Sequence, residues 1–406
     1  MHDIQFITGG VTAPSGFMAA GIHCGIRRNK TKRDLGLIVA DRLCTAAAVV
    51  TTNRVKAAPI ILTMKHLENG MARAILINSG NANACAPGGL EAAKKCADTA
   101  AAALGIKPED IIVNSTGVIG QPLPTDTITS AIPTLVDALS MDSGPVEEAI
   151  MTTDTFVKTI AVRCTIGGKP VVIGGIAKGS GMIHPNMATM LAFLTTDCAI
   201  SPALLKEALQ TSANRTYNRI SVDGDTSTND MTAILASGTA GNTEITDKNA
   251  DYKVFLAALD AVNLDLAKKI AKDGEGATKL ITCRVSGTAD EETAVVLAKS
   301  VISSSLVKSM VFGADANVGR VLCAMGYSGA DFDTTMVDVA FSSDAGRVTV
   351  CEKGIGLQFD ENLAKAVLTQ NEVTIEIILL EGNATAEAYG CDLTYDYVKI
   401  NGDYRS

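Results

Sequence analysis

An internal threonine in an unusual segment is the first residue of this sequence that could do covalent chemistry. The segment runs from Lys178 to Phe193, and in it small and turn-forming residues lead into Ala188-Thr189 before an apolar, strand-like run. A threonine hydroxyl is a weak nucleophile unless a base lies beside it, and an N-terminal threonine can use its own α-amine as that base. Thr189 would gain such an amine only if its hydroxyl attacked the Ala188 carbonyl and the chain were cut between them. By its residues alone this signal has low specificity, because a threonine that opens a strand is usually explained by β-propensity.

Three short clusters of Gly, Ser, Asn and Thr follow apolar, strand-like runs at Asn78–Ala84, Asn114–Gly117 and Lys178–Gly181. A strand that ends in such residues exposes backbone N–H groups, which can bind an anion or a developing oxyanion. Each cluster alone is compatible with an ordinary polar turn. The three together favour a binding site.

The chain lacks the motifs of several other enzyme classes. It contains no Walker A sequence, no GxGxxG after a strand, no GxSxG and no HExxH, and its ten cysteines form no CxxC pair. We therefore expect no metal site and no cofactor, and we expect the cysteines to be incidental thiols of a reducing cytoplasm.

The composition of the chain excludes further classes of binding partner. The 406 residues carry a net charge of −9, with 4% aromatic residues and no Trp, which argues against a nucleic-acid groove or a platform for base stacking. No Lys or Arg precedes Arg27, which argues against a signal or transit peptide, and no apolar run approaches the roughly 18 residues of a membrane span. These features predict a cytoplasmic protein that binds neither nucleic acid nor membrane.

The elements that must position these residues follow from periodicity. Runs rich in Val and Ile alternate with amphipathic patterns through the first two thirds of the chain, and the remainder is mainly strand-like after one helix, which predicts an α/β or α+β body and a smaller, β-rich C-terminal domain. The expected strands include Ala74–Ile77, Asp110–Val113, Pro170–Ile173, Met310–Val311, Met336–Phe341, Arg347–Cys351, Val373–Leu380 and Asp392–Ile400. The expected helices are Leu90–Leu104, Pro202–Arg219, Asn249–Lys272 and Asp290–Leu306.

Further blocks of small and polar residues are spread along almost the whole chain: Thr51–Pro59, Asn78–Cys85, Asn114–Gly117, Met151–Thr155, Val222–Asp230, Asp273–Lys279 and Tyr397–Tyr404. Together with the segment around Thr189, and in the same order, they resemble the ornithine acetyltransferase family (glutamate N-acetyltransferase, ArgJ type). The resemblance implies a layered αββα-type sandwich of the DmpA/ArgJ-like fold.

The resemblance also implies roles for matching residues. Thr189 is similar to the family nucleophile, which becomes the N-terminus of a second chain after self-cleavage between Ala188 and Thr189. Thr116 and Gly117 match the pair that forms the oxyanion hole. The residues that match substrate-binding positions are Thr153, Lys178, Thr189, Glu275, Asn401 and Ser406.

By this resemblance the reaction is a ping-pong acyl transfer. Thr189 takes the acetyl group from N²-acetylornithine and passes it to glutamate, while its α-amine moves the protons. Lys178 would meet the α-carboxylate of the substrate, and Glu275 the cationic side chain of ornithine. Related enzymes that have two functions also accept acetyl-CoA as the donor, and no residue here separates the two types.

The same resemblance implies an organisation into two chains. Residues 1–188 would form an α chain and 189–406 a β chain, in which about 189–282 complete the catalytic domain and about 283–406 form an α+β subdomain. The implied assembly has two α and two β chains, and the substrates are its small-molecule partners.

Two positions depart from the family pattern. Val318 stands where relatives often carry Trp, and Ser406 stands where Thr is common. Thr152 directly precedes Thr153, so either residue could make that substrate contact. Two other functions stay open at this point: a self-processing aminopeptidase or amidohydrolase of the related fold, and a binding protein in which Thr189 remains internal.

Overall fold

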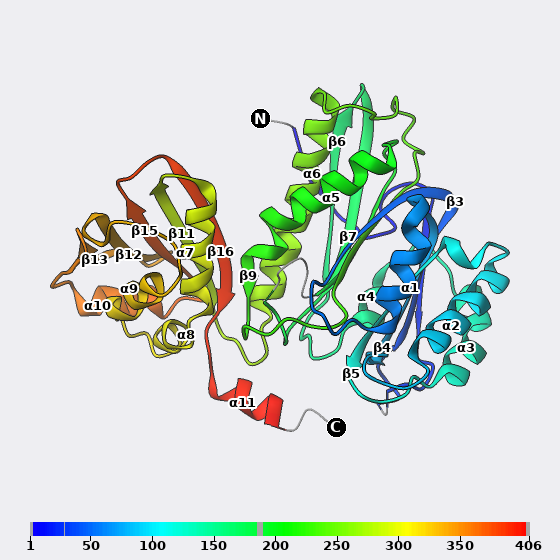
Figure 1. The fold of residues 1–406 in the computed structure, drawn as a ribbon, viewed down its shortest axis with the longest axis horizontal. Helices are drawn as coiled ribbons and strands as arrows, with labels where there is room; N and C mark the ends of the chain where they lie inside the picture. Colours follow the sequence, from blue (N-terminus) through cyan, green and yellow to red (C-terminus); the bar gives the residue numbers. More distant parts are fainter. Residues whose placement is uncertain (1–2, 28, 185–189, 403–406) are drawn as a thin grey trace. The chain divides into compact units, whose positions relative to one another are not determined.

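A computed structural model of the chain describes residues 3–27, 29–184 and 190–402. These residues divide into two compact units. The first takes in the described residues among 1–179, 185–218 and 226–266, and the second those among 180–184, 219–225 and 267–406. Figure 1 shows the helices and strands of both.

A nine-stranded mixed sheet forms the framework of the first unit, in the order β1-β6-β7-β8-β10-β3-β4-β5, with β2 paired to β3. Its strands are β1 (Gln5–Ile7), β2 (Phe17–Ile22), β3 (Leu35–Val50), β4 (Met71–Asn81), β5 (Ile111–Val118), β6 (Lys158–Ile166), β7 (Lys169–Lys178), β8 (Leu191–Thr196) and β10 (Met231–Ala236). Its helices are α1 (Ala58–His66), α2 (Gly89–Leu104), α3 (Thr125–Asp137), α4 (Gly144–Ile150), α5 (Pro202–Arg215) and most of α6 (Ala250–Lys272).

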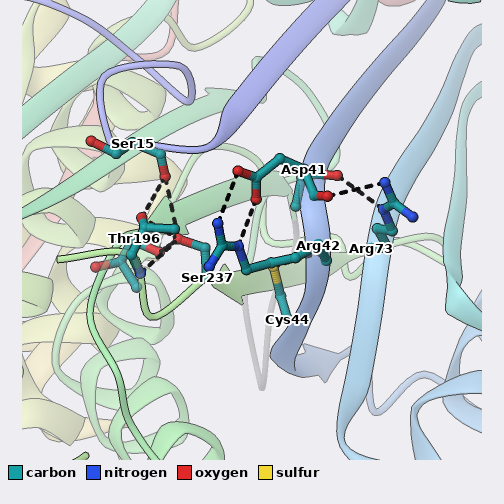
Figure 2. Close-up of polar contacts among 9 residues, drawn as sticks. Ser15, Asp41, Arg42, Cys44, Arg73, Thr196 and Ser237 are labelled. Atoms are coloured by element: carbon teal, nitrogen blue, oxygen red, sulfur yellow. Dashed lines mark hydrogen bonds and ion pairs between the residues drawn. The ribbon is translucent and has the colours of Figure 1, made fainter. Parts of the chain in front are cut away.

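The long strand β3 serves both halves of this sheet. Its beginning pairs with β2 and β4 and its end with β10, and its register with β4 shifts between Val39 and Cys44. At the shift, the Arg73 guanidinium donates hydrogen bonds at 3.1 Å to the carbonyl oxygens of Ala40 and Asp41 (Figure 2). These bonds satisfy backbone groups that leave the ladder, so the strand can bend there without unpaired carbonyls.

The bend folds the sheet over a shared core. Ile75 and Ile77 of β4 belong to the same buried cluster as Phe193 of β8 and Leu235 of β10. On the opposite face of β3 to β5, a second cluster joins the strands to α2 and α3. On the opposite face of β7, an added Cβ at Gly175 would meet Val262 and Leu266 of α6. The layers therefore follow the order α, β, β, α, and the predicted sandwich is confirmed.

The second unit is built on a seven-stranded sheet in the order β14-β13-β12-β15-β11-β16-β9, which buries one apolar core. Val318 begins α9 and packs, partly buried, against this core. The strands are β9 (Ile220–Ser221), β11 (Leu280–Thr288), β12 (Val337–Ser343), β13 (Gly346–Glu352), β14 (Ile355–Gly356), β15 (Glu372–Leu379) and β16 (Ala384–Cys391). The helices are α7 (Glu291–Ser303), α8 (Ser305–Phe312), α9 (Val318–Gly326), α10 (Glu361–Leu368) and α11 (Tyr395–Gly402).

Two predicted strands of this unit are wrong. Met310–Val311 lies inside α8, which begins after the Ser304 cap and buries Val307, Met310 and Val311 on one helical face. A short apolar pair fits helical and strand periods equally well. The run Asp392–Ile400 ends in α11, a helix without buried residues, so its Tyr and Val side chains do not serve a sheet.

Among the described residues, no single helix combines the length and apolar character needed to cross a membrane, and one bent pair, α7 with α8, meets the criterion by length and composition only.

Candidate active site

Thr116 and Gly117 are the sixth and seventh residues of β5 and lie beside an irregularity in its pairing with β4. The parallel pairing of β4 and β5 reaches Gly80 opposite Gly117, and Asn81 then faces both Thr116 and Val118. Gly117 has φ +133°, and an added Cβ would overlap the Gly80 carbonyl carbon and lie 2.6 Å from the Asn81 nitrogen. Only glycine fits this position, so close backbone contacts fix the conformation of this end of β5.

Buried amide side chains bind the backbone and side chain of Ser115, the residue before Thr116. The Asn229 Nδ2 donates hydrogen bonds to the carbonyl oxygens of Ala82, at 2.6 Å, and Ser115, at 2.8 Å. The Ser115 hydroxyl donates to Oδ1 of Asn78 at 2.6 Å. Two of the three predicted clusters, Asn78–Ala84 and Asn114–Gly117, are therefore brought together.

Lys178 joins the same place from the end of β7. Its Nζ donates a hydrogen bond to Thr116 Oγ1 at 3.4 Å, and the residue is 8% exposed. A buried ammonium group beside a rigid strand end is suited to bind an anion. The structure thus places three of the predicted site residues, Thr116, Gly117 and Lys178, together near the ends of β5 and β7.

A buried carboxylate that sequence reasoning missed, that of Asp154, lies next to Lys178 and Gly179. Asp154 Oδ1 accepts hydrogen bonds from Lys158 Nζ and from the Gly179 backbone N–H, each at 2.7 Å, and Oδ2 accepts one from the Thr152 N–H at 2.9 Å. Burial by itself would raise the pKa of Asp154, but the ammonium groups of Lys178 and Lys158 and these hydrogen bonds hold it well below its usual range. Thr153, a predicted substrate contact, lies half-buried directly before Asp154.

A second carboxyl group, Asp230, precedes β10 and is 3% exposed. Its Oδ2 makes no hydrogen bond within the described part of the chain. Burial raises its pKa well above the ordinary value, although Ser227 and Lys178 act in the opposite direction. Both Asp154 and Asp230 lie in blocks that resemble the family, which was the one available signal for them.

The predicted cleavage site, Ala188-Thr189, lies outside the described residues. On its C-terminal side, the Met190 carbonyl accepts a hydrogen bond from the Met231 N–H at 3.0 Å, and β8 begins at the next residue. On its N-terminal side, in the second unit, Asp223 accepts hydrogen bonds from the backbone N–H groups of Met182, at 2.6 Å, and Ile183, at 2.8 Å. Both flanks of the site are therefore anchored.

Within the second unit, the structure brings two predicted substrate-binding residues together. Asn401 Nδ2 donates a hydrogen bond to Glu275 Oε2 at 2.7 Å. Glu275 is buried, with 6% of the residue exposed, and its carboxylate lies where a side chain at Gly181 would be. Ser406, the remaining predicted contact, lies outside the described residues. In the described part of the chain, no group of three or more His, Cys, Asp or Glu side chains could hold a metal ion.

Comparison with known proteins gives a consistent result. A profile described as the ArgJ family matches residues 18–406. The arginine biosynthesis bifunctional protein ArgJ of Caldanaerobacter subterraneus subsp. tengcongensis is 50% identical over 405 residues, which cover 99% of this chain and all of that protein. ArgJ 1 of Clostridium acetobutylicum is 53% identical over 96% of both chains.

Among solved structures, ornithine acetyltransferase complexed with ornithine from Mycobacterium tuberculosis is 34% identical. The match covers 46% of this chain and 100% of that one, with a TM-score of 0.42. The family profile spans nearly the whole chain, and both relatives exceed 49% identity over almost their full length. The chain belongs to the ArgJ family.

Proposed function

We propose that this chain is an acetyltransferase of arginine biosynthesis that carries the acetyl group of N²-acetylornithine to glutamate. Its relatives are named as arginine biosynthesis proteins, which supports the pathway. The single observation that supports the chemistry is one contact. The buried Lys178 ammonium lies 3.4 Å from the hydroxyl of Thr116, which directly precedes the strained Gly117 in β5. A rigid strand end of this kind can stabilise an oxyanion, and the ammonium group can bind a carboxylate.

In this proposal the chain makes its own nucleophile. The Thr189 hydroxyl attacks the carbonyl carbon of Ala188, and the acyl group passes from the Thr189 nitrogen to its oxygen as the peptide bond breaks. Water then hydrolyses this ester, which leaves a carboxylate on Ala188 and restores the Thr189 hydroxyl beside a free α-amine. That amine then accepts the proton of the Thr189 hydroxyl in each later attack. No metal and no organic cofactor take part, because acid, base and nucleophile all belong to one residue.

Transfer then proceeds in two half-reactions. Thr189 Oγ1 attacks the acetyl carbonyl of N²-acetylornithine, and the negative oxygen is stabilised by Thr116 and Gly117. The protonated α-amine gives its proton to the departing amine of ornithine, which leaves an acetyl ester on Thr189. The α-amine of glutamate attacks this ester, Thr189 regains its proton, and N-acetylglutamate leaves.

Substrate recognition follows from charge. Lys178 meets the α-carboxylate that both amino acids share, with Thr153 as its neighbour at the site. Glu275, with Asn401, meets the cationic side chain of ornithine, and Ser406 completes the site. Acetyl-CoA is a second donor to test, and the assembly we propose has two α and two β chains.

One experiment tests the cleavage and the reaction together. The purified protein is analysed by denaturing electrophoresis and N-terminal sequencing, and then assayed with acetyl-labelled N²-acetylornithine and glutamate. We expect two fragments, the second beginning Thr-Met-Leu-Ala, and label in N-acetylglutamate. Thr189→Ala should remain one chain and transfer no label. Active protein with an intact chain would refute the mechanism, and label released only as acetate would identify a hydrolase instead.

A further inference from the structure

The amide side chain of Asn229 is held by three hydrogen bonds near the ends of β4 and β5. Asn229 is 3% exposed and lies two residues before β10. Its Nδ2 donates to the carbonyl oxygens of Ala82, at 2.6 Å, and Ser115, at 2.8 Å, and its Oδ1 accepts from the Thr228 hydroxyl at 2.6 Å. A primary amide has two N–H donors, so both are used here, and the third bond orients the group that donates them.

These bonds lie where the pairing of β4 with β5 becomes irregular. The register shifts after Gly80, and Asn81 faces both Thr116 and Val118. Irregular pairing takes backbone groups out of the regular ladder, and buried groups of this kind need hydrogen-bond partners from elsewhere. Asn229 supplies one donor to each of the two segments, so a single side chain ties them to each other.

The bond to the Ser115 carbonyl acts on Thr116 through covalent geometry. The Ser115 carbonyl and the Thr116 N–H belong to one planar peptide group, so a partner that fixes the oxygen also fixes the rotation of the whole plane. The direction of the Thr116 side chain depends on that plane. Lys178 Nζ donates to Thr116 Oγ1 at 3.4 Å. Asn229 therefore fixes the backbone of Thr116, while Lys178 contacts its hydroxyl.

Resting on the function proposed above, we propose that Asn229 is a positioning residue for the oxyanion hole. It acts through Thr116, which it holds in the orientation from which the hydroxyl donates to the oxygen that becomes negative. An oxyanion is stabilised most by donors that are in place before the reaction begins. Asn229 follows the predicted cut, whereas Ala82 and Ser115 precede it, so these positioning bonds would join the later fragment to the earlier one.

The alternative is that Asn229 only satisfies two buried carbonyl groups and so stabilises the fold. A double-mutant cycle with Thr116 separates the two roles, because residues that act as a unit have non-additive effects. Asn229→Asp keeps the size of the side chain and removes both amide donors. It is compared with Thr116→Val and with the double variant. For each protein we would measure kcat per cleaved chain, both KM values and the unfolding free energy.

Asn242 provides a matched control in the same unit. It is 7% exposed, and its Nδ2 also donates to two backbone carbonyl oxygens, those of Ala199 at 3.0 Å and Thr243 at 2.8 Å. These carbonyls follow β8 and β10 and do not belong to β4 or β5. Asn242→Asp therefore makes the same chemical change to a buried amide that has no contact with Ser115.

We expect Asn229→Asp to lower kcat about thirtyfold, because misalignment of a catalytic donor is costly. The oxyanion forms in both half-reactions, so both should slow together and each KM should stay within about twofold of the wild-type value. In the Thr116→Val background the hydroxyl is already absent, so the same change should lower kcat by no more than about threefold. Asn242→Asp should lose stability but keep kcat within about twofold of wild type.

An unchanged kcat in Asn229→Asp, or an equally large loss in the Thr116→Val background, would overturn the proposal. An equal loss of kcat in Asn242→Asp would do the same. If Asn229→Asp does not fold, Asn229→Ala takes its place in the cycle, because it removes the same donors without adding a charge. Wild-type protein that forms no N-acetylglutamate would refute the proposed function itself, whereas active wild type with additive effects would refute only the role of Asn229.

Discussion

Lys178 Nζ lies 3.4 Å from Thr116 Oγ1, although 62 residues separate them along the chain. The hydroxyl oxygen accepts this hydrogen bond, so its own proton remains free to be donated elsewhere. One residue thus orients another, and together they present an O–H donor and an ammonium group where the ends of β5 and β7 meet.

Thr116→Val keeps the shape of this residue but removes its hydroxyl. If the hydroxyl stabilises the oxyanion, kcat for acetyl transfer should fall about a hundredfold, the usual loss for one such donor. Thr116→Ser restores the hydroxyl and should recover most of the rate. Equal rates for the Val and Ser variants in steady-state assays would exclude this role.

Gly117→Ala tests the strained backbone at Gly117. The added methyl group would overlap the backbone of Gly80, and the alanine would have to keep the unfavourable φ of +133°. We therefore expect the variant to lose several kcal/mol of unfolding free energy and nearly all of its activity. Gly120→Ala is the matched control, because Gly120 has φ +84° but no atom within 4 Å of the added Cβ. It should cost only about 1 kcal/mol. Chemical denaturation of both variants gives the comparison, and similar losses would show that crowding at Gly80 is unimportant.

Glu275→Gln should affect the two substrates differently. Loss of the negative charge removes a charge-assisted contact with the cationic side chain of N²-acetylornithine, so its KM should rise about tenfold or more. The KM for glutamate, which has no such cation, should not rise. Glu372→Gln, at an exposed ion pair with Lys272, serves as the control. A parallel rise of both KM values in Glu275→Gln would contradict the assignment.

Asp230→Asn should make stability less dependent on pH. Burial raises the pKa of Asp230 in the folded protein above that in the unfolded chain. Stability is therefore greatest below the unfolded pKa, about 4, and falls as pH rises from there through the folded pKa, by at most about 1.4 kcal/mol per unit. Asparagine does not titrate, so the melting temperature of the variant relative to wild type should increase between pH 5 and pH 8. A difference that is constant or shrinks over this range would show that Asp230 is already ionised.

Sequence reasoning was sufficient where strand ends carry polar residues. Thr116, Gly117 and Lys178 stand out in the sequence because they follow apolar runs, and Lys178 does contact Thr116. Their strands, β5 and β7, are separated in the sheet by β8, β10, β3 and β4, so the contact depends on the folding of the sheet over its core, which the sequence does not reveal. It was not sufficient for Lys158 and Asp154, since a Lys four residues after an Asp is normally a solvated pair, and only the packing of the chain buries this one. The strand predicted at Met310–Val311 was wrong for a different reason. Two adjacent apolar residues are too few to distinguish the period of a helix from that of a strand.

The strand order of the first unit determines how a cut chain would behave. β8 and β10 follow the predicted cut, yet β8 pairs with β7, and β10 pairs with β3, two strands that precede it. The later fragment is thus threaded into the middle of a sheet whose other strands belong to the earlier fragment. Salt or dilution could separate the fragments only by breaking the backbone hydrogen bonds between β8 and β7 and between β10 and β3. We therefore expect the two fragments to remain associated until they unfold, and to unfold in one thermal transition.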